Sequence, residues 1–347
     1  MKSSKQFEIF SGTGGVGKTT LATSRAISLA KSGKSVLLIT IDPAKRLREI
    51  LNLGLDSAGQ VTHLPDPFNK NEKLDLYVEL MNPEYTFKRI AKESNSEEIL
   101  DNRILKILTS PFGGLNEILS IVELNIQYKS KKFDVIVLDT PPGSHFLDFL
   151  DSVDRIKVFF DQSFIDIFNY LGKKTSNIEL SKSKKIFNLV VSTGVKKLLG
   201  YLNKVTGDKF IDDFIDAILS FYKTKDSFLD ALNLQNKLKQ SSFSNWFLVT
   251  SVEQNKLKEA LELKAHAKDL ITKDSVILLN KCIENSLNNW EATGEKEIEL
   301  KDSLILREQK LKEGLKKYFD EIIEFPEVFQ VSPEEHIKNL TTNWNNT

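Results

Sequence analysis

The 347-residue sequence contains a single cysteine, Cys282. One thiol excludes a disulfide within the chain, a zinc site built from CxxC pairs of one chain, and a metalloid site of three thiolates. A chain of this length does not need such crosslinks, because it can bury about 75% of its unfolded surface. Since few cysteines are typical of proteins in a reducing cytosol, we expect a cytoplasmic protein.

The sequence also lacks an excess of either charge and any long apolar run. Its 48 Lys and Arg residues balance 48 Asp and Glu residues, whereas proteins that bind nucleic acid or anionic bilayers by bulk charge carry a cationic surplus. No run approaches the ~20 apolar residues that cross a bilayer, and residues 1–10 lack the apolar stretch of a signal peptide. We therefore expect no nucleic-acid partner and no membrane-spanning segment.

A glycine-rich motif near the N-terminus is the first strong functional signal. The apolar residues 7–10 precede SGTGGVGKTT, and an apolar helical pattern follows in TLATSRAISLAKSG. Strand, loop and helix with the spacing G-x-x-x-x-G-K-T predict a phosphate-binding P-loop, in which Lys18 contacts the β- and γ-phosphates and Thr19 contacts Mg²⁺. The candidate nucleotide-binding residues are Gly12, Thr13, Gly14, Gly15, Val16, Gly17, Lys18, Thr19 and Thr20.

The same glycines admit a second interpretation. Gly12, Gly14 and Gly17 also spell G-x-G-x-x-G, the dinucleotide-binding fingerprint. Asp42 lies near the distance expected for a ribose-binding acid, so a nicotinamide or flavin enzyme is an alternative. The lysine and threonine after the third glycine favour the P-loop, because a dinucleotide fold has no reason to place them at the pyrophosphate.

Two further apolar runs end in aspartate. Residues 35–41 and 133–138 are typical of parallel strands buried on both faces, and they stop at Asp42 and Asp139. Ligands bind at the carboxyl ends of such strands. The second run with its aspartate is a Walker B pattern, in which the acid holds Mg²⁺, usually through a water, and the following loop senses the γ-phosphate.

Two more candidate strands, residues 246–251 and 276–280, complete an alternating pattern of helices and strands. We predict an α/β fold: a P-loop NTPase whose doubly wound, mostly parallel sheet is flanked by helices, with an inserted helical subdomain. The second strand ends in NKCI, where a guanine-reading loop needs Asn-Lys-x-Asp. Because Ile283 replaces the acid, ATP is favoured over GTP. Asn280 either bonds adenine or simply closes the strand.

The chain divides into three predicted parts. Residues 1–145 and 246–347 form the first and second parts of a P-loop ATPase domain, and residues 146–245 form the helical insert. The insert holds 12 of the 22 phenylalanines. These rings either build the insert's own core or line a groove for a hydrophobic segment that assembles when ATP brings two subunits together.

In GTGGVGKTT, TIDPAKRL and FDVIVLDTPPGSHFLDFLD the chain resembles the arsenite-pump and tail-anchored-protein-targeting ATPases, and most closely their bacterial anion-transporting ATPase-like branch with a single P-loop. The segments NPEYTFKRI, SPFGGLNEILSIVEL and FLVTSVEQNKLKEALEL extend the resemblance over essentially the whole chain. It implies an ATPase that uses ATP and Mg²⁺ and switches a homodimer, or a heterodimer with a paralogue, between client-binding conformations. The implied partner is a hydrophobic client or an integral-membrane protein, met in the cytoplasm or at the membrane surface.

The resemblance also implies roles for particular residues. Asp42 corresponds to the first switch, whose acid orients or deprotonates the attacking water. Asn280 matches an adenine-contacting residue, and Pro326 matches a loop that closes over the base. The second switch, which reports the state of the γ-phosphate, comprises Asp139, Thr140, Pro141, Pro142, Gly143, Ser144 and His145.

Departures from the family leave alternatives open. The family commonly carries a lysine at the position of Thr13, which reaches the partner's phosphates, and Lys45, Arg46 or Arg48 could replace its charge. If none does, hydrolysis is expected to be slow, and a nucleotide-binding scaffold with little turnover is then an alternative. An arsenite or anion efflux ATPase is disfavoured by the single thiol. A positioning ATPase of the septum-site type would need an amphipathic C-terminal membrane helix, and the tail EEHIKNLTTNWNNT has few apolar residues.

Overall fold

The computed structural model describes residues 4–41, 47–48, 57–69, 73–110, 115–143, 213, 216–217, 223–253, 255–267, 270–271, 275–329 and 332–345. The chain divides into two compact units. The first comprises residues 1–81, 127–150 and 236–347, and the second comprises residues 82–126 and 151–235. Most of the predicted insert at 146–245 lies outside the described residues, so the three-part division stays a prediction.

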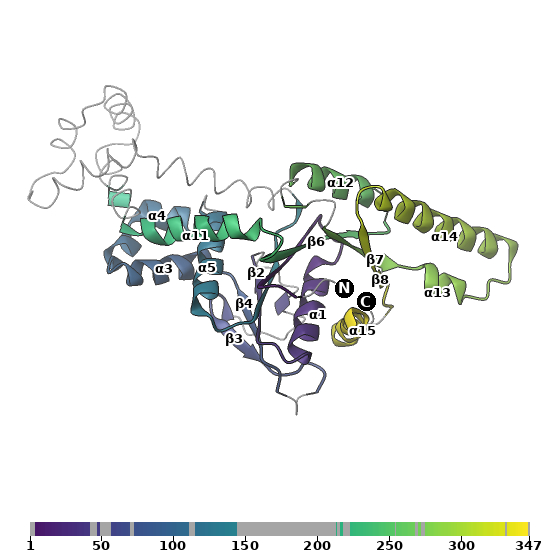
Figure 1. Ribbon diagram of the computed structural model, residues 1–347, viewed down its shortest axis with the longest axis horizontal. Coiled ribbons are helices and arrows are strands. Elements are labelled where there is room, and N and C mark those ends of the chain that lie inside the picture. The colour runs from purple at the N-terminus through teal and green to yellow at the C-terminus, as the bar shows by residue number, and fades with distance from the viewer. Residues whose placement is uncertain are drawn as a thin grey trace, which may run out of the picture. The chain divides into compact units, whose positions relative to one another are not determined.

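The first unit contains an eight-stranded sheet (Figure 1), in the order β3-β4-β2-β5-β1-β6-β7-β8. Every neighbouring pair is parallel except β3 and β4, which are antiparallel. The strands are β1 (Phe7–Gly12), β2 (Val36–Thr40), β3 (Val61–Leu64), β4 (Leu76–Leu80), β5 (Val135–Asp139), β6 (Ser244–Ser251), β7 (Val276–Cys282) and β8 (Glu321–Pro326). The predicted α/β fold with a mostly parallel sheet is confirmed, and the strands expected from apolar runs are all present.

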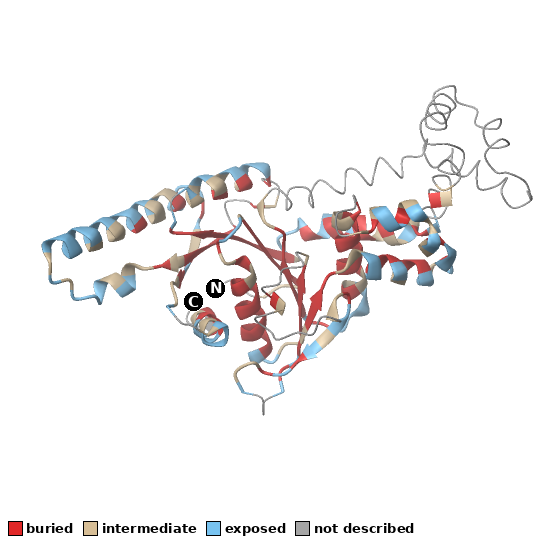
Figure 2. Cartoon of the chain, turned by 180° about the vertical axis from the view of Figure 1, so that it is seen from behind, coloured by how far each residue is buried: buried red, intermediate tan, exposed pale blue. Residues whose placement is uncertain are grey.

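Helices α1 and α15 pack against one face of this sheet. Alternate residues of the central strands, such as Phe10, Val137 and Phe247, form one buried cluster with residues of both helices. The intervening strand residues are buried as well, so β1, β2, β5 and β6 are covered on both faces, as is typical of parallel sheets (Figure 2). The helices that the structure describes over their full length in this unit are α1 (Lys18–Lys31), α12 (Lys256–His266), α13 (Glu284–Asn288), α14 (Glu295–Lys316) and α15 (Pro333–Asn345).

A buried ion pair joins α1 to the sheet. The guanidinium of Arg25 donates to both carboxylate oxygens of Glu8 on β1, at 2.7 and 2.9 Å. The same guanidinium lies 5.0 Å from the ring centre of Trp344 on α15, and the indole N–H of Trp344 donates to Ser24 Oγ at 2.9 Å. Paired charges are tolerated in a core only in a defined geometry, so the pair fixes how α1 lies on β1.

The C-terminal helix α15 is part of the core of the first unit. Its apolar residues Ile337, Leu340 and Trp344 are all buried, and α15 lies beside α1 (Figure 1). The apolar face that a membrane-binding helix would offer is therefore already used for packing.

The second unit is helical in the part that the structure describes. Its helix α3 begins after Asn82, whose side-chain oxygen accepts the N–H groups of Glu84 and Tyr85, and Pro83 occupies the first turn, where its missing donor costs nothing. The buried carboxylate of Glu123 accepts from Thr86 within this unit. The helices that fall in its range, wholly or in part, are α3 (Pro83–Glu93), η2 (Glu97–Asp101), α4 (Arg103–Leu108), α5 (Asn116–Ser130) and α11 (Lys225–Leu238).

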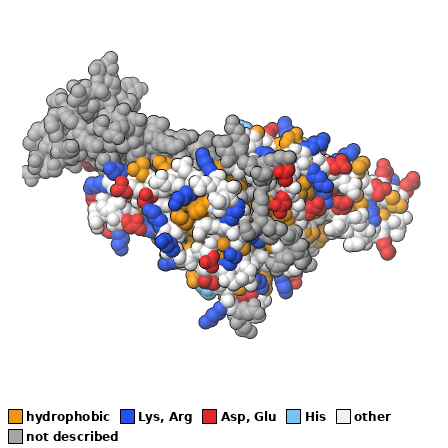
Figure 3. All heavy atoms as spheres, viewed as in Figure 1, with side chains coloured by type: hydrophobic (Ala, Val, Ile, Leu, Met, Phe, Trp, Pro, Cys, Tyr) orange, Lys and Arg blue, Asp and Glu red, His pale blue; other side chains and the backbone are white. Residues whose placement is uncertain are grey.

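The described surface is mixed in charge. On the face seen in Figure 3, basic and acidic side chains are interspersed among the described atoms, as the balanced composition predicts. Within the described ranges, no helix combines the length and the apolar character needed to cross a bilayer.

Lys312 of α14 joins three carboxylates that come from different elements. Its ammonium lies 2.7 Å from Glu284, 2.9 Å from Glu308 and 2.7 Å from Glu324. Burial alone would lower the pKa of Lys312, but the hydrogen bonds to these glutamates outweigh it and raise the pKa, so the ammonium stays charged. The Glu308 side chain is 1% exposed, and Lys312 is the cation that pairs with it.

Replacing Lys312 by methionine should therefore destabilise the first unit by about 3 kcal/mol, because it leaves the buried Glu308 carboxylate without its cation. Urea unfolding followed by tryptophan fluorescence measures this, since Trp246, Trp290 and Trp344 all fall in the first unit. The exposed Lys310 on the same helix is the control, and Lys310→Met should change stability by less than about 0.5 kcal/mol. Equal effects of the two substitutions would contradict this account.

Candidate nucleotide-binding site

The glycine-rich loop connects β1 to α1 and is tightly enclosed at both ends. A Cβ atom on Gly12 would lie 2.4 Å from the backbone oxygen of Val249 on β6, and one on Gly17 would lie 2.3 Å from Asn280 Nδ2. Gly17 also has a φ of 93°, which side chains other than glycine rarely adopt. The two glycines that frame the motif are therefore required by contacts with neighbouring strands.

Lys18 lies at the first position of α1 and folds back over the loop. Its Nζ donates to the backbone oxygen of Thr13 at 3.0 Å, and the residue is 7% exposed. The ammonium is thus held inside the curve of the loop, where the motif predicts a phosphate contact.

Thr19 and Asp139 are hydrogen-bonded to each other, although 120 positions separate them in the sequence. Thr19 Oγ1 donates to Asp139 Oδ2 at 2.8 Å. Thr40, at the end of β2, donates to the same oxygen at 3.2 Å. The parallel pairing of β2 with β5 places Thr40 beside Asp139, which is why these oxygens meet at the carboxyl edge of the sheet. Sequence reasoning missed Thr40.

The segment after Asp139 is described as far as Gly143. Thr140 is buried and donates from Oγ1 to the backbone oxygen of Phe10 at 2.8 Å, so the start of the predicted second switch is tied to β1. Asp42, Ser144 and His145 lie outside the described residues. Lys45 and Arg46, two of the three residues that could replace the charge of the missing lysine, lie outside them too.

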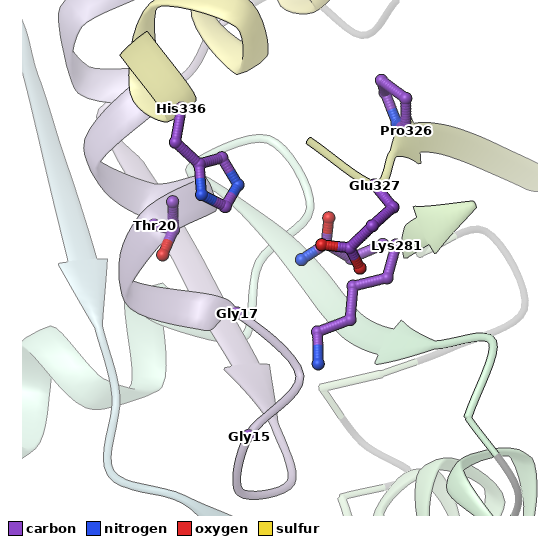
Figure 4. A pocket seen from close by; sticks show the side chains of 8 residues that line it. Gly15, Gly17, Thr20, Lys281, Pro326, Glu327 and His336 are labelled. Carbon is purple, nitrogen blue, oxygen red and sulfur yellow. The ribbon is translucent and has the colours of Figure 1, made fainter. Parts of the chain in front are cut away.

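A pocket opens beside the loop and gathers the residues predicted to contact the base (Figure 4). Asn280 and Pro326 line it together with Gly15, Gly17 and Thr20. The P-loop, α1, β7 and β8 therefore meet here, at the carboxyl ends of β1, β7 and β8.

Asn280 has a structural contact as well as a place in the pocket. Its side-chain nitrogen donates to the backbone oxygen of Val16 at 2.9 Å, and the residue is buried. Asn280 was predicted either to contact adenine or simply to close the strand. The structure adds a third role, because Asn280 on β7 supports the P-loop through its bond to Val16. Contact with adenine stays a prediction.

Three further residues line the pocket and were not singled out from the sequence. They are Lys281, Glu327 and His336, all labelled in Figure 4. Lys281 directly follows the predicted strand 276–280, and Glu327 directly follows the observed strand β8. Because ligands bind at the carboxyl ends of such strands, this position was the signal that could have identified both residues. His336 comes from α15, and no local pattern indicates that α15 reaches this edge.

Fold and loop geometry together define a P-loop protein of the nucleotide-binding α/β class. The sequence model of the family described as "Anion-transporting ATPase" matches residues 5–326. The chain belongs to this family, as the sequence motifs indicated.

Individual relatives match only part of this chain, at moderate sequence identity. An "ATPase ASNA1 homolog" of Plasmodium falciparum is 36% identical over 146 residues, 42% of this chain and 36% of the relative. One of Babesia bovis is 30% identical over 235 residues, 63% of this chain and 60% of the relative. A "Putative arsenical pump-driving ATPase 2" of Aquifex aeolicus is 31% identical over 158 residues, 44% of this chain and 51% of the relative. The chain thus spans between 36% and 60% of the length of these relatives.

The packing of the loop makes a prediction that is independent of function. Gly12→Ala should lower the stability of the first unit by about 2 kcal/mol, because the new methyl group meets a backbone oxygen that cannot move aside. Gly14 is the matched control, since a Cβ there has no atom within 4 Å. Thermal unfolding followed by tryptophan fluorescence compares them. Equal melting temperatures for the two variants would show that β6 does not enclose the loop as described.

Proposed function

We propose that this protein is a Mg²⁺-dependent ATPase. The observation that carries the proposal is the meeting of Lys18, Thr19 and Asp139 at one edge of the sheet, beside a loop whose glycines leave room for phosphate. Backbone N–H groups at the start of a helix favour an anion, and Lys18 adds a full positive charge. The relatives named above are all described as ATPases, which supports the same activity.

The donor set suits magnesium. Thr19 offers a hydroxyl oxygen and Asp139 a carboxylate, and the two oxygens are 2.8 Å apart. Mg²⁺ prefers oxygen ligands and keeps several waters. Thr19 would bind the ion directly and Asp139 through a water. When bound with ATP, the ion neutralises charge that develops between the β- and γ-phosphates.

The pocket beside the loop is the candidate base site. Asn280 offers an amide that reads hydrogen-bonding edges, and Pro326 offers an apolar surface for a ring. Because Ile283 stands where a guanine-binding acid is required, we propose adenine as the base. The acid at Asp42 is proposed to align the attacking water, and the loop that starts at Asp139 is proposed to respond to loss of the γ-phosphate.

The phosphate site is tested by two substitutions. Lys18→Ala should reduce the ATP hydrolysis rate by at least about 100-fold, because it removes charge stabilisation in the transition state. Asp139→Asn should raise the Mg²⁺ concentration needed for half-maximal activity by about tenfold or more. A coupled phosphate-release assay over a range of Mg²⁺ concentrations measures both.

Lys34→Ala is the control for these measurements, because Lys34 lies beyond the other end of α1. It should leave both quantities unchanged. A Lys18→Ala variant that hydrolyses ATP at the wild-type rate would end the assignment.

We further propose that ATP binding and hydrolysis switch a dimer between conformations that bind and release a hydrophobic client. The support is the enrichment of phenylalanine in residues 146–245 and the connection of the second-switch segment to the phosphate site through Asp139. The partner is a second copy or a paralogue, and the site of action is the cytoplasm or the membrane surface.

This role predicts nucleotide-dependent contact with an apolar peptide. A photo-crosslinking peptide of about 20 apolar residues should label residues 146–245 with ATP and Mg²⁺ but much less with ADP. Light scattering should show a mass about twice 39.4 kDa under the first condition only. A peptide of equal length rich in serine and glycine is the control. Labelling that does not depend on the nucleotide would argue for the alternative, a nucleotide-binding scaffold.

An arsenite-driven activity is the other alternative, and the environment of Cys282 disfavours it. The thiol is buried. Burial, and then the charges of Glu308 and Glu324, raise its pKa, so it stays protonated at neutral pH. Both carboxylates already bind Lys312. A protonated, enclosed thiol is a poor ligand for a metalloid.

A further inference from the structure

Helix α12 contacts the tip of the P-loop through its first residue. The ammonium of Lys256 donates to the backbone oxygen of Gly14 at 3.3 Å and to Glu259 Oε2 at 2.7 Å. The Lys256 side chain is 18% exposed, so it lies along the loop and does not extend into solvent. A positive charge from a distant part of the sequence is thereby placed on the loop.

Glu259, one turn further along α12, connects the same helix to the neighbouring loop residue. Hydrogen bonds from Lys256 and, more weakly, from the Thr13 side chain lower the pKa of Glu259, so its carboxylate is charged at neutral pH. Two consecutive residues of the loop, Thr13 and Gly14, are therefore held by one acid and one base of α12. The ion pair with Glu259 holds the Lys256 ammonium in place while it still donates to the Gly14 oxygen.

The end of the loop that α12 contacts is the end at which the motif predicts the γ-phosphate. Lys18, whose role in this motif is to contact the β- and γ-phosphates, has its ammonium on the carbonyl of Thr13. Lys256 has its ammonium on the next carbonyl, that of Gly14. Two lysines thus donate to successive backbone oxygens at one point of the loop.

A neutral carbonyl is a weaker partner for an ammonium than a phosphate oxygen, because two opposite full charges attract each other more strongly than a charge attracts the partial charge of a carbonyl. A terminal phosphate that enters the loop would therefore draw Lys256 away from Gly14, while Glu259 keeps hold of the side chain. ADP lacks the group that this exchange requires.

We propose that Lys256 binds the γ-phosphate of ATP as a second cation of the site, within the same chain as the P-loop. This inference rests on the proposed ATPase function. It places a cation on α12 within the same chain, whereas Lys45, Arg46 and Arg48 were candidates to replace a lysine that reaches the partner's phosphates. A cation at the γ-phosphate stabilises the charge that grows on the phosphoryl group as it is transferred.

The chain offers a matched control on the same helix. Lys258 lies two positions further on, its side chain is 81% exposed, and its nearest acid is Glu262 at 3.8 Å. Lys256→Gln and Lys258→Gln remove the same charge from the same helix, one beside the loop and one in solvent. Lys256→Arg keeps the charge.

The experiment measures binding of a non-hydrolysable ATP analogue and of ADP, each with Mg²⁺, by calorimetry, together with the rate of ATP hydrolysis. For Lys256→Gln we expect affinity for the ATP analogue to fall about tenfold, and kcat to fall about tenfold or more, since one charged hydrogen bond to the transferred group is lost. Affinity for ADP should change by less than about twofold, as ADP has no γ-phosphate. Lys256→Arg should retain most of both properties, and Lys258→Gln all of them.

Two outcomes would overturn the inference. If Lys256→Gln weakens the ATP analogue and ADP equally, Lys256 only supports the loop. If Lys256→Gln behaves like Lys258→Gln, it has no role at the phosphate. The proposed ATPase function fails on a different result, namely no Lys18-dependent hydrolysis by the wild-type protein, so the two failures are distinguishable.

Discussion

The hydrogen bond from Thr19 to Asp139 is the contact on which the candidate site depends. It joins the first turn of α1 to the end of β5, and so fixes the P-loop relative to the acid of the central sheet. The bond forms because β1 and β5 are parallel neighbours whose carboxyl ends meet at one edge. In an open α/β sheet this edge is where loops from several strands converge, and a small change in strand register would separate the two oxygens.

The loop itself is held from several directions before any nucleotide arrives. Val249 of β6 lies against Gly12, Asn280 of β7 bonds to Val16, and Lys256 of α12 bonds to Gly14. A loop that is held by several neighbouring contacts loses little conformational entropy when phosphate binds. The same contacts connect the loop to β7, which lines the candidate base pocket, and to α12, which carries Lys256. The phosphate site and the base site are therefore supported by the same elements.

The sequence was sufficient for the central strands, the P-loop and Asp139, because continuous apolar runs and a fixed glycine spacing are local patterns. It was not sufficient for β3, where two of the four residues are exposed, or for β8, where only part of the strand is buried. Lys256 and His336 could not be found either, since each reaches the site through helix packing over a long sequence separation. Asn280 was identified by position, but its bond to Val16 required coordinates.

We propose that the loop after β1 and the acid after β5 form one site for ATP and Mg²⁺. A crystal structure with a non-hydrolysable ATP analogue and Mg²⁺ tests this most directly. We expect phosphates within residues 13–19, Mg²⁺ bound by Thr19 in place of its direct hydrogen bond to Asp139, and the base against Asn280 and Pro326. Phosphates bound elsewhere, or a bound nucleotide with Mg²⁺ remote from Thr19 and Asp139, would contradict the account.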